Sequence, residues 1–240
     1  MDRFHILPWD SEFFGMPIAR IIPDRLTTGD LRETVARLRD NGIRLAYWPS
    51  DPDDEESQRA AQVCGGFFAD RKVTYVTDLG QRTDAPDTVE QGVEEYDGCD
   101  TCDELERLAV QAGIYSRFKL DPRIPDEKFA ELYRLWIRNS VNRKIADGVL
   151  VVRRSGSIVG MVTVAEKNRR GDIGLIAVDG SMRGKNLGVA LVRAAQEWSR
   201  RRGFWIAQVV TQGENAAACR LYEKCGYTVE KVEHFYHFWI

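Results

Sequence analysis

The sequence has little of what marks a secreted, membrane-bound or nucleic-acid-binding protein. Its five cysteines are an odd number without the spacing of a disulfide framework, and no apolar run approaches membrane-spanning length. The amino terminus lacks the hydrophobic segment of a signal peptide. The formal net charge is −3, whereas a nucleic-acid-binding domain is usually distinctly basic. We therefore expect a cytoplasmic protein that binds neither membrane nor nucleic acid.

Candidate metal ligands are also scarce. Cys99 and Cys102 form a lone Cys-x-x-Cys pair, and the histidines, His5, His234 and His237, are not clustered with it in the sequence. A structural zinc site takes four ligands. We therefore interpret these cysteines as reduced thiols, as in a cytosolic protein, and expect no metal site.

The composition is that of a globular protein in two parts. The 240 residues, 43% hydrophobic and 30% charged, are long for one minimal domain and short for two full ones. A polar stretch from residue 81 to 98, with Pro86, predicts a linker followed by a strand near residues 89–96. We place a boundary near residue 85, which gives an N-terminal subdomain (1–85) and a larger domain (86–240).

The first part has the pattern of a small α/β subdomain. Strands are expected at residues 18–22, 43–48 and 73–79, with helices at 30–39 and 55–64 between them. The pair Asp30 and Glu33 has the spacing of a capping box at the first helix. An aromatic and acidic stretch, Trp9 to Gly15, precedes these elements and shows no clear periodicity.

The second part begins with two expected helices, at residues 103–112 and 126–140, the first preceded by a Thr101-x-x-Glu104 capping box. A hairpin is predicted for 149–153 and 158–165. Two strands, 227–232 and 234–240, end the chain. The last is aromatic throughout, which is consistent with strand pairing in a homodimer and equally with a buried closing strand.

The most informative stretch runs from residue 172 to 227. Ile173–Val178 is a short apolar run typical of a buried strand. A basic, glycine-containing loop follows, and then a helix from Leu187 with one apolar face, ended by Gly203. A further strand and a short helix complete the stretch.

The loop between the strand and the helix has the features of an anion-binding site. The first N–H groups of a helix lack internal partners and point outward at the positive end of the helix dipole. Gly184 and Gly188 permit close approach of the main chain, and Arg183 and Lys185 add positive charge. The loop matches neither a Walker A sequence nor Gly-x-Gly-x-x-Gly. An ordinary connection with surface arginines is the alternative.

Two motifs carry a family resemblance. Arg183-Gly-Lys-Asn-Leu-Gly188 resembles the Gln/Arg-x-x-Gly-x-Gly/Ala acyl-CoA loop of the GNAT N-acetyltransferase superfamily, and residues 215–227 resemble its second signature. The resemblance implies an α/β (α+β) fold with a mixed, mostly antiparallel sheet and splayed central strands, plus the smaller N-terminal subdomain. It also implies acetyl-CoA, or another short acyl-CoA, as co-substrate.

The same resemblance assigns roles to individual residues. Backbone groups of Ile176, Ala177 and Val178 are expected to pair with pantetheine and the thioester. The diphosphate is expected on the loop, formed by Arg183, Gly184, Lys185, Asn186, Leu187, Gly188 and Val189. Asn215 is expected at the CoA arm and also suits a helix N-cap. Tyr222 corresponds to the tyrosine that protonates the leaving thiolate.

Two points depart from a simple match. Asn186 stands where the family pattern has its first glycine; asparagine tolerates the left-handed conformation, although its side chain can crowd a phosphate. No general base is obvious: Asp172 could act through water, but an exposed aspartate at the start of a strand is the simpler interpretation, and the amine can also bind unprotonated.

Shorter motifs narrow the resemblance to the TDP-fucosamine acetyltransferase branch, which acetylates a dTDP-linked amino sugar. They include Trp9 to Gly15 and Ser116-Arg-Phe-x-x-Asp121. We therefore expect a nucleotide-sugar acceptor, with Arg117, Asp121, Trp9 and Phe14 as candidate contacts. For these four, loop ion pairing or packing is the alternative. Acetylation of a protein, peptide or small-molecule amine, and a non-catalytic acyl-CoA-binding module, remain alternatives for the whole chain.

Overall fold

The computed structural model describes residues 3–80 and 92–240. The chain forms two compact units, each assembled from segments far apart in the sequence. Unit 1 comprises Met1–Val73, Ser116–Arg123 and Lys231–Ile240, and unit 2 comprises Thr74–Tyr115 and Ile124–Glu230. The boundary predicted near residue 85 lies outside the described residues.

Unit 1 is built on a mixed sheet whose strands lie in the order β1-β2-β3-β10-β4. Strand β2 runs parallel to β3, whereas β1 with β2 and β10 with β3 are antiparallel pairs. The strands are β1 (Phe4–Ile6), β2 (Ile18–Ile21), β3 (Leu45–Ser50), β4 (Phe67–Asp78) and β10 (Thr228–Trp239). The central β3 is buried along its whole length.

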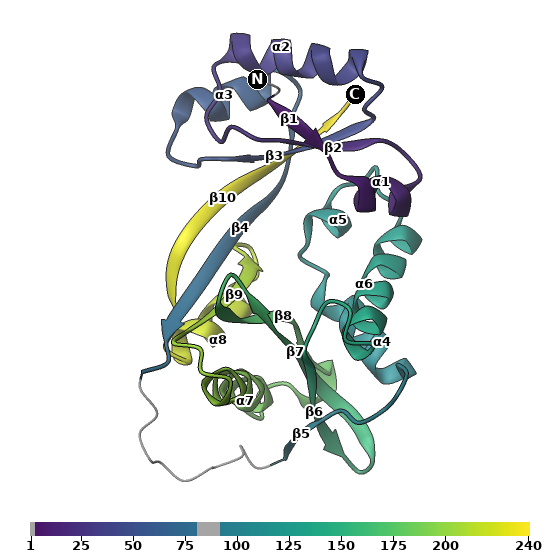
Figure 1. Ribbon diagram of the computed structural model, residues 1–240, viewed down its shortest axis with the longest axis vertical. Coiled ribbons are helices and arrows are strands. Elements are labelled where there is room, and N and C mark those ends of the chain that lie inside the picture. The colour runs from purple at the N-terminus through teal and green to yellow at the C-terminus, as the bar shows by residue number, and fades with distance from the viewer. Residues whose placement is uncertain (1–2, 81–91) are drawn as a thin grey trace. The chain divides into compact units, whose positions relative to one another are not determined.

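Two helices of unit 1, α2 (Thr28–Asp40) and α3 (Glu55–Val63), pack their apolar faces into one core with this sheet. Trp48 of β3 and Tyr236 and Phe238 of β10 form its aromatic part. Figure 1 shows α2 and α3 beside β1 to β3. The short helices α1 (Pro8–Phe14) and α5 (Arg117–Leu120) also belong to unit 1.

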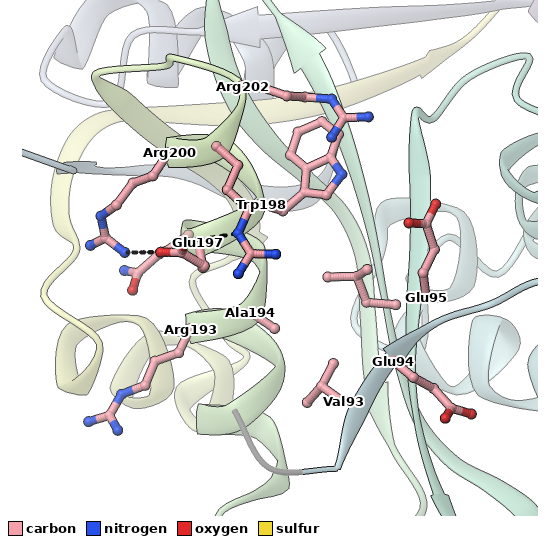
Figure 2. A pocket seen from close by; sticks show the side chains of 12 residues that line it. Val93, Glu94, Glu95, Arg193, Ala194, Glu197, Trp198, Arg200 and Arg202 are labelled. Atoms are coloured by element: carbon pink, nitrogen blue, oxygen red, sulfur yellow. Dashed lines mark hydrogen bonds and ion pairs between the residues drawn. The ribbon is translucent and has the colours of Figure 1, made fainter. Parts of the chain in front are cut away.

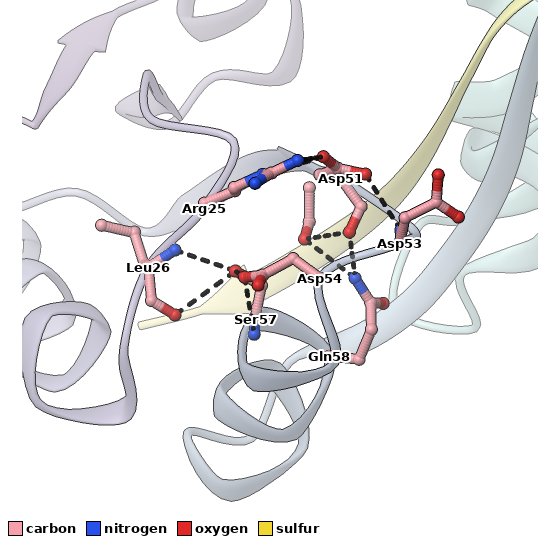
Figure 3. A network of polar contacts seen from close by, with 8 residues as sticks. Arg25, Leu26, Asp51, Asp53, Asp54, Ser57 and Gln58 are labelled. Atoms are coloured by element: carbon pink, nitrogen blue, oxygen red, sulfur yellow. Dashed lines mark hydrogen bonds and ion pairs between the residues drawn. The ribbon is translucent and has the colours of Figure 1, made fainter.

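The helices of unit 1 begin at capping residues that the sequence only partly indicated. Helix α2 is capped by Thr27, whose side chain accepts from the backbone N–H of Asp30, so the predicted cap at Asp30 was three residues late. At α3 the side chain of Asp54 accepts from the N–H of Ser57. The hydroxyl oxygen of Ser57 also accepts a hydrogen bond of 2.8 Å from the backbone N–H of Leu26 (Figure 3). The acidic run from Asp51 to Glu56 has the composition of a solvated helix start, and α3 does begin within it, after Asp54.

Unit 2 contains a second run of strands, in the order β4-β9-β8-β7-β6-β5. Neighbours from β8 to β5 are antiparallel, whereas β8 and β9 are parallel. The strands are β5 (Val93–Glu95), β6 (Gly148–Arg154), β7 (Ser157–Lys167), β8 (Arg170–Val178) and β9 (Ile206–Gln212). This is the mixed, mostly antiparallel sheet predicted.

Four longer helices complete unit 2: α4 (Asp103–Ala112), α6 (Asp126–Val141), α7 (Leu187–Arg201) and α8 (Ala216–Lys224). A 3₁₀ turn, η1 (Gly180–Met182), follows β8. Helix α4 begins after Cys102, which makes no side-chain cap; the hydroxyl of Thr101 donates instead to Glu106. The predicted Thr101 capping box is therefore wrong, because the helix starts one residue later than that motif requires.

Strands β8 and β9 separate within unit 2. Their register consists of three pairs, Gly171 with Ala207, Asp172 with Gln208 and Ile173 with Val209. Strand β8 continues to Val178, where its pairing is with β7 alone. The predicted splay of the central strands is confirmed.

One further prediction needs correction. The carboxyl-terminal strands expected at 227–232 and 234–240 form one continuous strand, β10, since no turn residue interrupts Val232 to His234. In unit 1 that strand lies between β3 and β4, and residues Phe235 to Phe238 are buried, which favours the buried closing strand over dimer pairing. The stretch beginning at Trp9 forms helix α1.

In the part of the chain that the structure describes, we find no helix with the length and apolarity needed to span a bilayer.

Candidate active site

A cavity of about 460 Å³ in unit 2 brings together most of the residues predicted to bind the cofactor. It is formed by the end of β8, the loop before α7, the first turn of α7, and α8. Its walls include the predicted residues Ile176, Ala177, Val178, Arg183, Gly184, Asn186, Leu187, Gly188, Val189, Asn215 and Tyr222. Lys185 is not part of the wall; its ammonium donates to the sulfur of Met182 at 3.4 Å.

The end of β8 contributes main-chain groups to this cavity. Past Ile173 its edge toward β9 carries no strand pairing in the β8–β9 register. A bulge in β8 places Gly174 and Leu175 opposite the single residue Thr163 of β7, and the Thr163 hydroxyl oxygen accepts from the N–H of Leu175 at 2.8 Å. The carbonyl of Val178 accepts from the side-chain amide of Gln111 on α4, at 2.7 Å. The end of β8 is thus held by β7 and by α4, while its edge toward β9 stays unpaired.

The loop that follows has the backbone needed to turn onto a helix. Gly184 has φ of 76° and Asn186 has φ of 58°, so both adopt the left-handed conformation. Asparagine is among the few non-glycine residues that enter this region at modest cost. The side-chain oxygen of Asn186 accepts from Lys224 of α8 at 3.3 Å. The side chain of Asn186 therefore has a partner of its own on α8.

The start of α7 offers backbone donors at the cavity. Asn186 makes no side-chain cap, and the first helical bond runs from the N–H of Ala190 to the carbonyl of Asn186, at 3.1 Å. The N–H groups of the first turn therefore point outward, at the positive end of the helix dipole. A Cβ on Gly188 would lie 3.2 Å from Leu221, so only glycine fits α7 against α8 without displacement.

Helix α8 supplies the remaining predicted groups. Asn215 is its N-cap, and its side-chain oxygen accepts from the N–H of Ala218 at 3.2 Å. Tyr222 is 2% exposed, and its ring lies 5.8 Å from that of Tyr75 and 5.9 Å from that of Tyr227, measured between centroids. Burial raises the pKa of the Tyr222 hydroxyl. The hydroxyl is therefore neutral and carries its proton at neutral pH.

Asp172 differs from its sequence-based interpretation as an exposed residue at a strand start. It lies third in β8, and burial raises the pKa of its carboxyl, against the effect of a hydrogen bond from Gln208. That bond, from Gln208 Nε2 to Asp172 Oδ1, measures 2.7 Å. The interpretation was wrong because β8 begins at Arg170 and is covered by its neighbours.

The residues predicted to contact the acceptor lie in unit 1. Trp9 is 44% exposed and stacks on Phe13, with 5.6 Å between ring centroids. Phe14 stacks on Phe118 at 5.8 Å. Asp121 is buried, and its carboxylate accepts three hydrogen bonds, from the His237 ring, the Trp239 indole and the Arg123 N–H. The guanidinium of Arg117 lies against the aromatic rings of Tyr47, Phe118 and Phe235.

A second cavity in unit 2, of about 660 Å³, lies between α7 and strands β5 and β6 (Figure 2). Charged groups in its wall already have partners within the protein. Arg201 Nε forms an ion pair with Glu197 Oε1 at 3.0 Å, and the Arg202 guanidinium lies 3.9 Å from the centre of the Trp198 ring. None of the predicted site residues lines it. We therefore regard the cavity at the end of β8 as the candidate active site.

Several residues of that cavity were not predicted from the sequence. They include Gln111, Ile114 and Tyr115 near the end of α4, and Lys224 on α8. The first three are far in sequence from the two motifs at residues 183–188 and 215–227. Lys224 could have been found, since it lies two residues after Tyr222 in the second signature. Among residues 3–80 and 92–240 no group of three or more His, Cys, Asp and Glu side chains is arranged to hold a metal ion.

The comparisons with known proteins agree with this geometry. The family model described as "Acetyltransferase (GNAT) family" matches residues 112–227, which include both motifs and the walls of the cavity from Ala112 onward. The chain belongs to the GNAT acetyltransferase family and is an acyl-CoA N-acyltransferase. The family uses acetyl-CoA as its acyl donor.

Two curated relatives are similar to this chain over different lengths. The chain is 33% identical to the dTDP-fucosamine acetyltransferase of Escherichia coli (strain CFT073) over 95% of both chains. It is 27% identical to the spore coat polysaccharide biosynthesis protein SpsD of Bacillus subtilis over 55% of this chain, and that match spans only 45% of the SpsD protein.

Solved structures support the fold. A GCN5-related N-acetyltransferase from Sphaerobacter thermophilus superimposes with a TM-score of 0.62 at 17% identity, covering 98% of this chain and 75% of that one.

Proposed function

We propose that the protein transfers the acetyl group of acetyl-CoA to the amine of a nucleotide-linked amino-dideoxy sugar, of the dTDP-amino-6-deoxyhexose class. The amine attacks the thioester directly while both substrates are bound. The 33% identity to a dTDP-fucosamine acetyltransferase over 95% of both chains supports this choice of acceptor.

The observation that carries the proposal is the cavity at the point where β8 and β9 part. The unpaired edge of β8 offers main-chain groups to an extended amide-bearing chain such as pantetheine. The outward N–H groups of α7, with Arg183 beside them, suit a diphosphate. These residues therefore fit an acyl-CoA, which would supply the activated acetyl group.

The chain's own groups can assist the transfer in two ways. A main-chain N–H at the end of β8 would stabilise negative charge on the carbonyl oxygen under attack, and losing one such donor typically lowers the rate about 10²–10³-fold. The Tyr222 hydroxyl, which like any phenol is protonated at neutral pH, would give its proton to the leaving thiolate.

A test is to measure thiol release from acetyl-CoA with a panel of amines and to identify the products by mass spectrometry. The panel contains dTDP-4-amino-4,6-dideoxygalactose, its 3-amino isomer, lysine-containing peptides and peptides with a free α-amine. We expect acetylation of an amino-sugar nucleotide and none of the peptides.

Two results would contradict the proposal. Acetylated peptides with unmodified sugar nucleotides would assign the chain to protein or peptide amines. A faster reaction with a longer acyl-CoA than with acetyl-CoA would change the donor while leaving the acceptor as proposed.

A further inference from the structure

The sheet of unit 1 has two different faces. Successive residues of a strand point to opposite sides, and along β10 the side chains of Tyr236 and Phe238 enter the apolar core with Trp48. Phe235 and His237 therefore point to the other side. On β3, Tyr47 lies directly opposite His237 in the register, with 4.9 Å between their ring centroids.

On the face toward the core, polar groups are paired. Gln58 of α3 accepts with its side-chain oxygen from the Tyr236 hydroxyl at 2.6 Å, and the same oxygen lies 2.9 Å from Nδ1 of His234. A tyrosine and a histidine of β10 thus share one protein partner.

On the opposite face, the same residue types have buried polar atoms without a partner. Tyr47 is 1% exposed and His237 is fully buried, yet within the described chain the Tyr47 hydroxyl and His237 Nε2 have no hydrogen-bond partner. The same holds for Nη1 of Arg117. Such atoms are rare in folded proteins, because burying an unpaired polar group is costly. The three side chains lie together, since the Arg117 guanidinium packs on the Tyr47 ring and that ring packs against His237, so this side of the sheet differs from the paired core side.

Asp121 determines what His237 can offer. Its carboxylate accepts from the Trp239 indole at 2.9 Å and lies 2.7 Å from His237 Nδ1. Although burial opposes it, the hydrogen bond with His237 helps to hold the pKa of Asp121 below its usual value. An ionised carboxylate can only accept, so Nδ1 carries the proton and Nε2 presents its lone pair. Burial lowers the pKa of His237 to about 4, which keeps this ring neutral.

Arg117 is held by aromatic rings instead of by a carboxylate. The carbon of its guanidinium lies 4.0 Å from the centre of the Tyr47 ring, 4.3 Å from that of Phe118 and 5.1 Å from that of Phe235. No ion pair to Arg117 is found among the described residues. Cation–π contacts fix the group while leaving its N–H donors for an oxyanion. The charge of Arg117 in turn lowers the pKa of the buried Asp70, against the larger effect of burial, which raises it.

Together these residues provide a hydrogen-bond acceptor (His237 Nε2), a cationic donor (Arg117) and a hydroxyl that can donate or accept (Tyr47). We propose that Tyr47, Arg117 and His237 recognise the acceptor, and that Asp121 is a positioning residue that orients His237. This rests on the proposed function and specifies its substrate contacts: Arg117 binds a phosphate oxygen, and His237 Nε2 accepts a hydrogen bond from a sugar hydroxyl. Asp121 then acts through His237, in place of the direct sugar contact expected from the sequence.

The test compares steady-state kinetics of Tyr47→Phe, His237→Gln, Asp121→Asn and Arg117→Lys with dTDP-4-amino-4,6-dideoxygalactose and acetyl-CoA. Each change should raise the KM for the sugar nucleotide about tenfold, the effect of one lost hydrogen bond, with the KM for acetyl-CoA within about twofold of native. Asp121→Asn should act by changing the tautomer of His237: the asparagine N–H can donate to Nδ1, so that the ring proton moves to Nε2, which then donates where it accepted before. The double variant Asp121→Asn/His237→Gln should then be no worse than His237→Gln alone.

The chain provides matched controls. His234→Gln and Tyr236→Phe change the same residue types in the same strand, on the face where Gln58 pairs them, and should leave both KM values unchanged. Tyr47→Phe also guards against misfolding: it removes a hydroxyl without a partner, so its Tm should equal or exceed that of the native protein while the acceptor KM still rises.

Unchanged acceptor KM values in Tyr47→Phe and His237→Gln, in an enzyme whose native form acetylates the sugar nucleotide, would overturn this inference and leave the proposed function intact. The role given to Asp121 is likewise overturned if the increase in acceptor KM in the double variant equals the product of the increases in Asp121→Asn and His237→Gln. If the native enzyme acetylates peptides only, the proposed function fails, and this assignment of a sugar-phosphate ligand fails with it.

Discussion

Gln208 of β9 donates a hydrogen bond of 2.7 Å to Asp172 of β8, and the two residues form the middle of the three pairs that join these strands. Immediately beyond Ile173 and Val209 the strands have no further pairs. The hydrogen bond between the Gln208 amide and the Asp172 carboxylate therefore joins β8 and β9 just before the fork, the point where the two strands separate and the candidate active site begins.

Replacing Gln208 should weaken this fork in a pH-dependent way. Gln208→Leu leaves the largely buried Asp172 carboxylate without its amide, which raises the pKa of Asp172 further. We expect a loss of about 1–3 kcal/mol in the free energy of unfolding at pH 8 and a smaller loss at pH 5, where the folded protein can protonate Asp172. Urea denaturation at both pH values measures this. Asp172→Asn, with no charge to bury, is the control and should show no such pH dependence.

Removing the Tyr222 hydroxyl should affect turnover more than binding. We expect Tyr222→Phe to lower kcat about 10²–10⁴-fold, because the leaving thiolate loses its proton donor, while the calorimetric Kd for CoA changes little. Tyr75→Phe is the matched control, since that hydroxyl donates to Glu223 at 3.1 Å. Native kcat and an unaltered pH profile in Tyr222→Phe would remove this tyrosine from the chemistry.

Substitutions at Asn186 should separate backbone from side-chain effects. With φ of 58°, this position favours glycine and asparagine, and alanine is strained there by about 1 kcal/mol. Asn186→Ala should therefore raise the KM for acetyl-CoA, whereas Asn186→Gly should not. Both variants lose the contact with Lys224, so equal KM values in the two would point to that contact and away from the backbone.

Stability should also respond to a buried carboxyl of unit 1. Burial raises the pKa of Asp70 to about 7, from 3.8, against the attraction of Arg117 and Lys72. Between about pH 4 and 7 the folded protein retains a proton that the unfolded chain has released, so this group makes stability fall as pH rises through that range.

Asp70→Asn removes the titration. We expect the variant to gain stability relative to the native protein from pH 4 to pH 7, reaching about 1–3 kcal/mol, with no further gain above pH 7. Thermal unfolding across this range tests it, with Asp40→Asn at the exposed end of α2 as control. A constant difference between variant and native protein would show that Asp70 is already ionised at pH 4.

The catalytic-domain elements could be predicted because their signals are local. The run Ile173–Val178, the glycine-containing loop and the apolar face of α7 each lie within one short window, and the structure has β8 and α7 there. Helix starts were less predictable: Thr27 and Asp30 both suit a cap, and the structure uses Thr27.

Long-range pairing could not be predicted in the same way. Nothing local indicates that Ser116–Arg123 belongs with the two ends of the chain in one compact unit, or that β10 lies between β3 and β4. Gln111 was missed as a cavity residue for the same reason, since its contact with Val178 spans 67 residues.

The sequence by itself determined the family, the order of elements in unit 2 and the loop at which the cofactor is expected, because short-range periodicity, glycine positions and a contiguous motif encode them. Only the tertiary structure decided which polar atoms are paired. Whether Asp121 faces a ligand or His237, and whether Tyr47 and His237 have partners, depends on strand register and on contacts across more than a hundred residues. Those contacts are fixed by packing of the whole unit and leave no local trace in the chain.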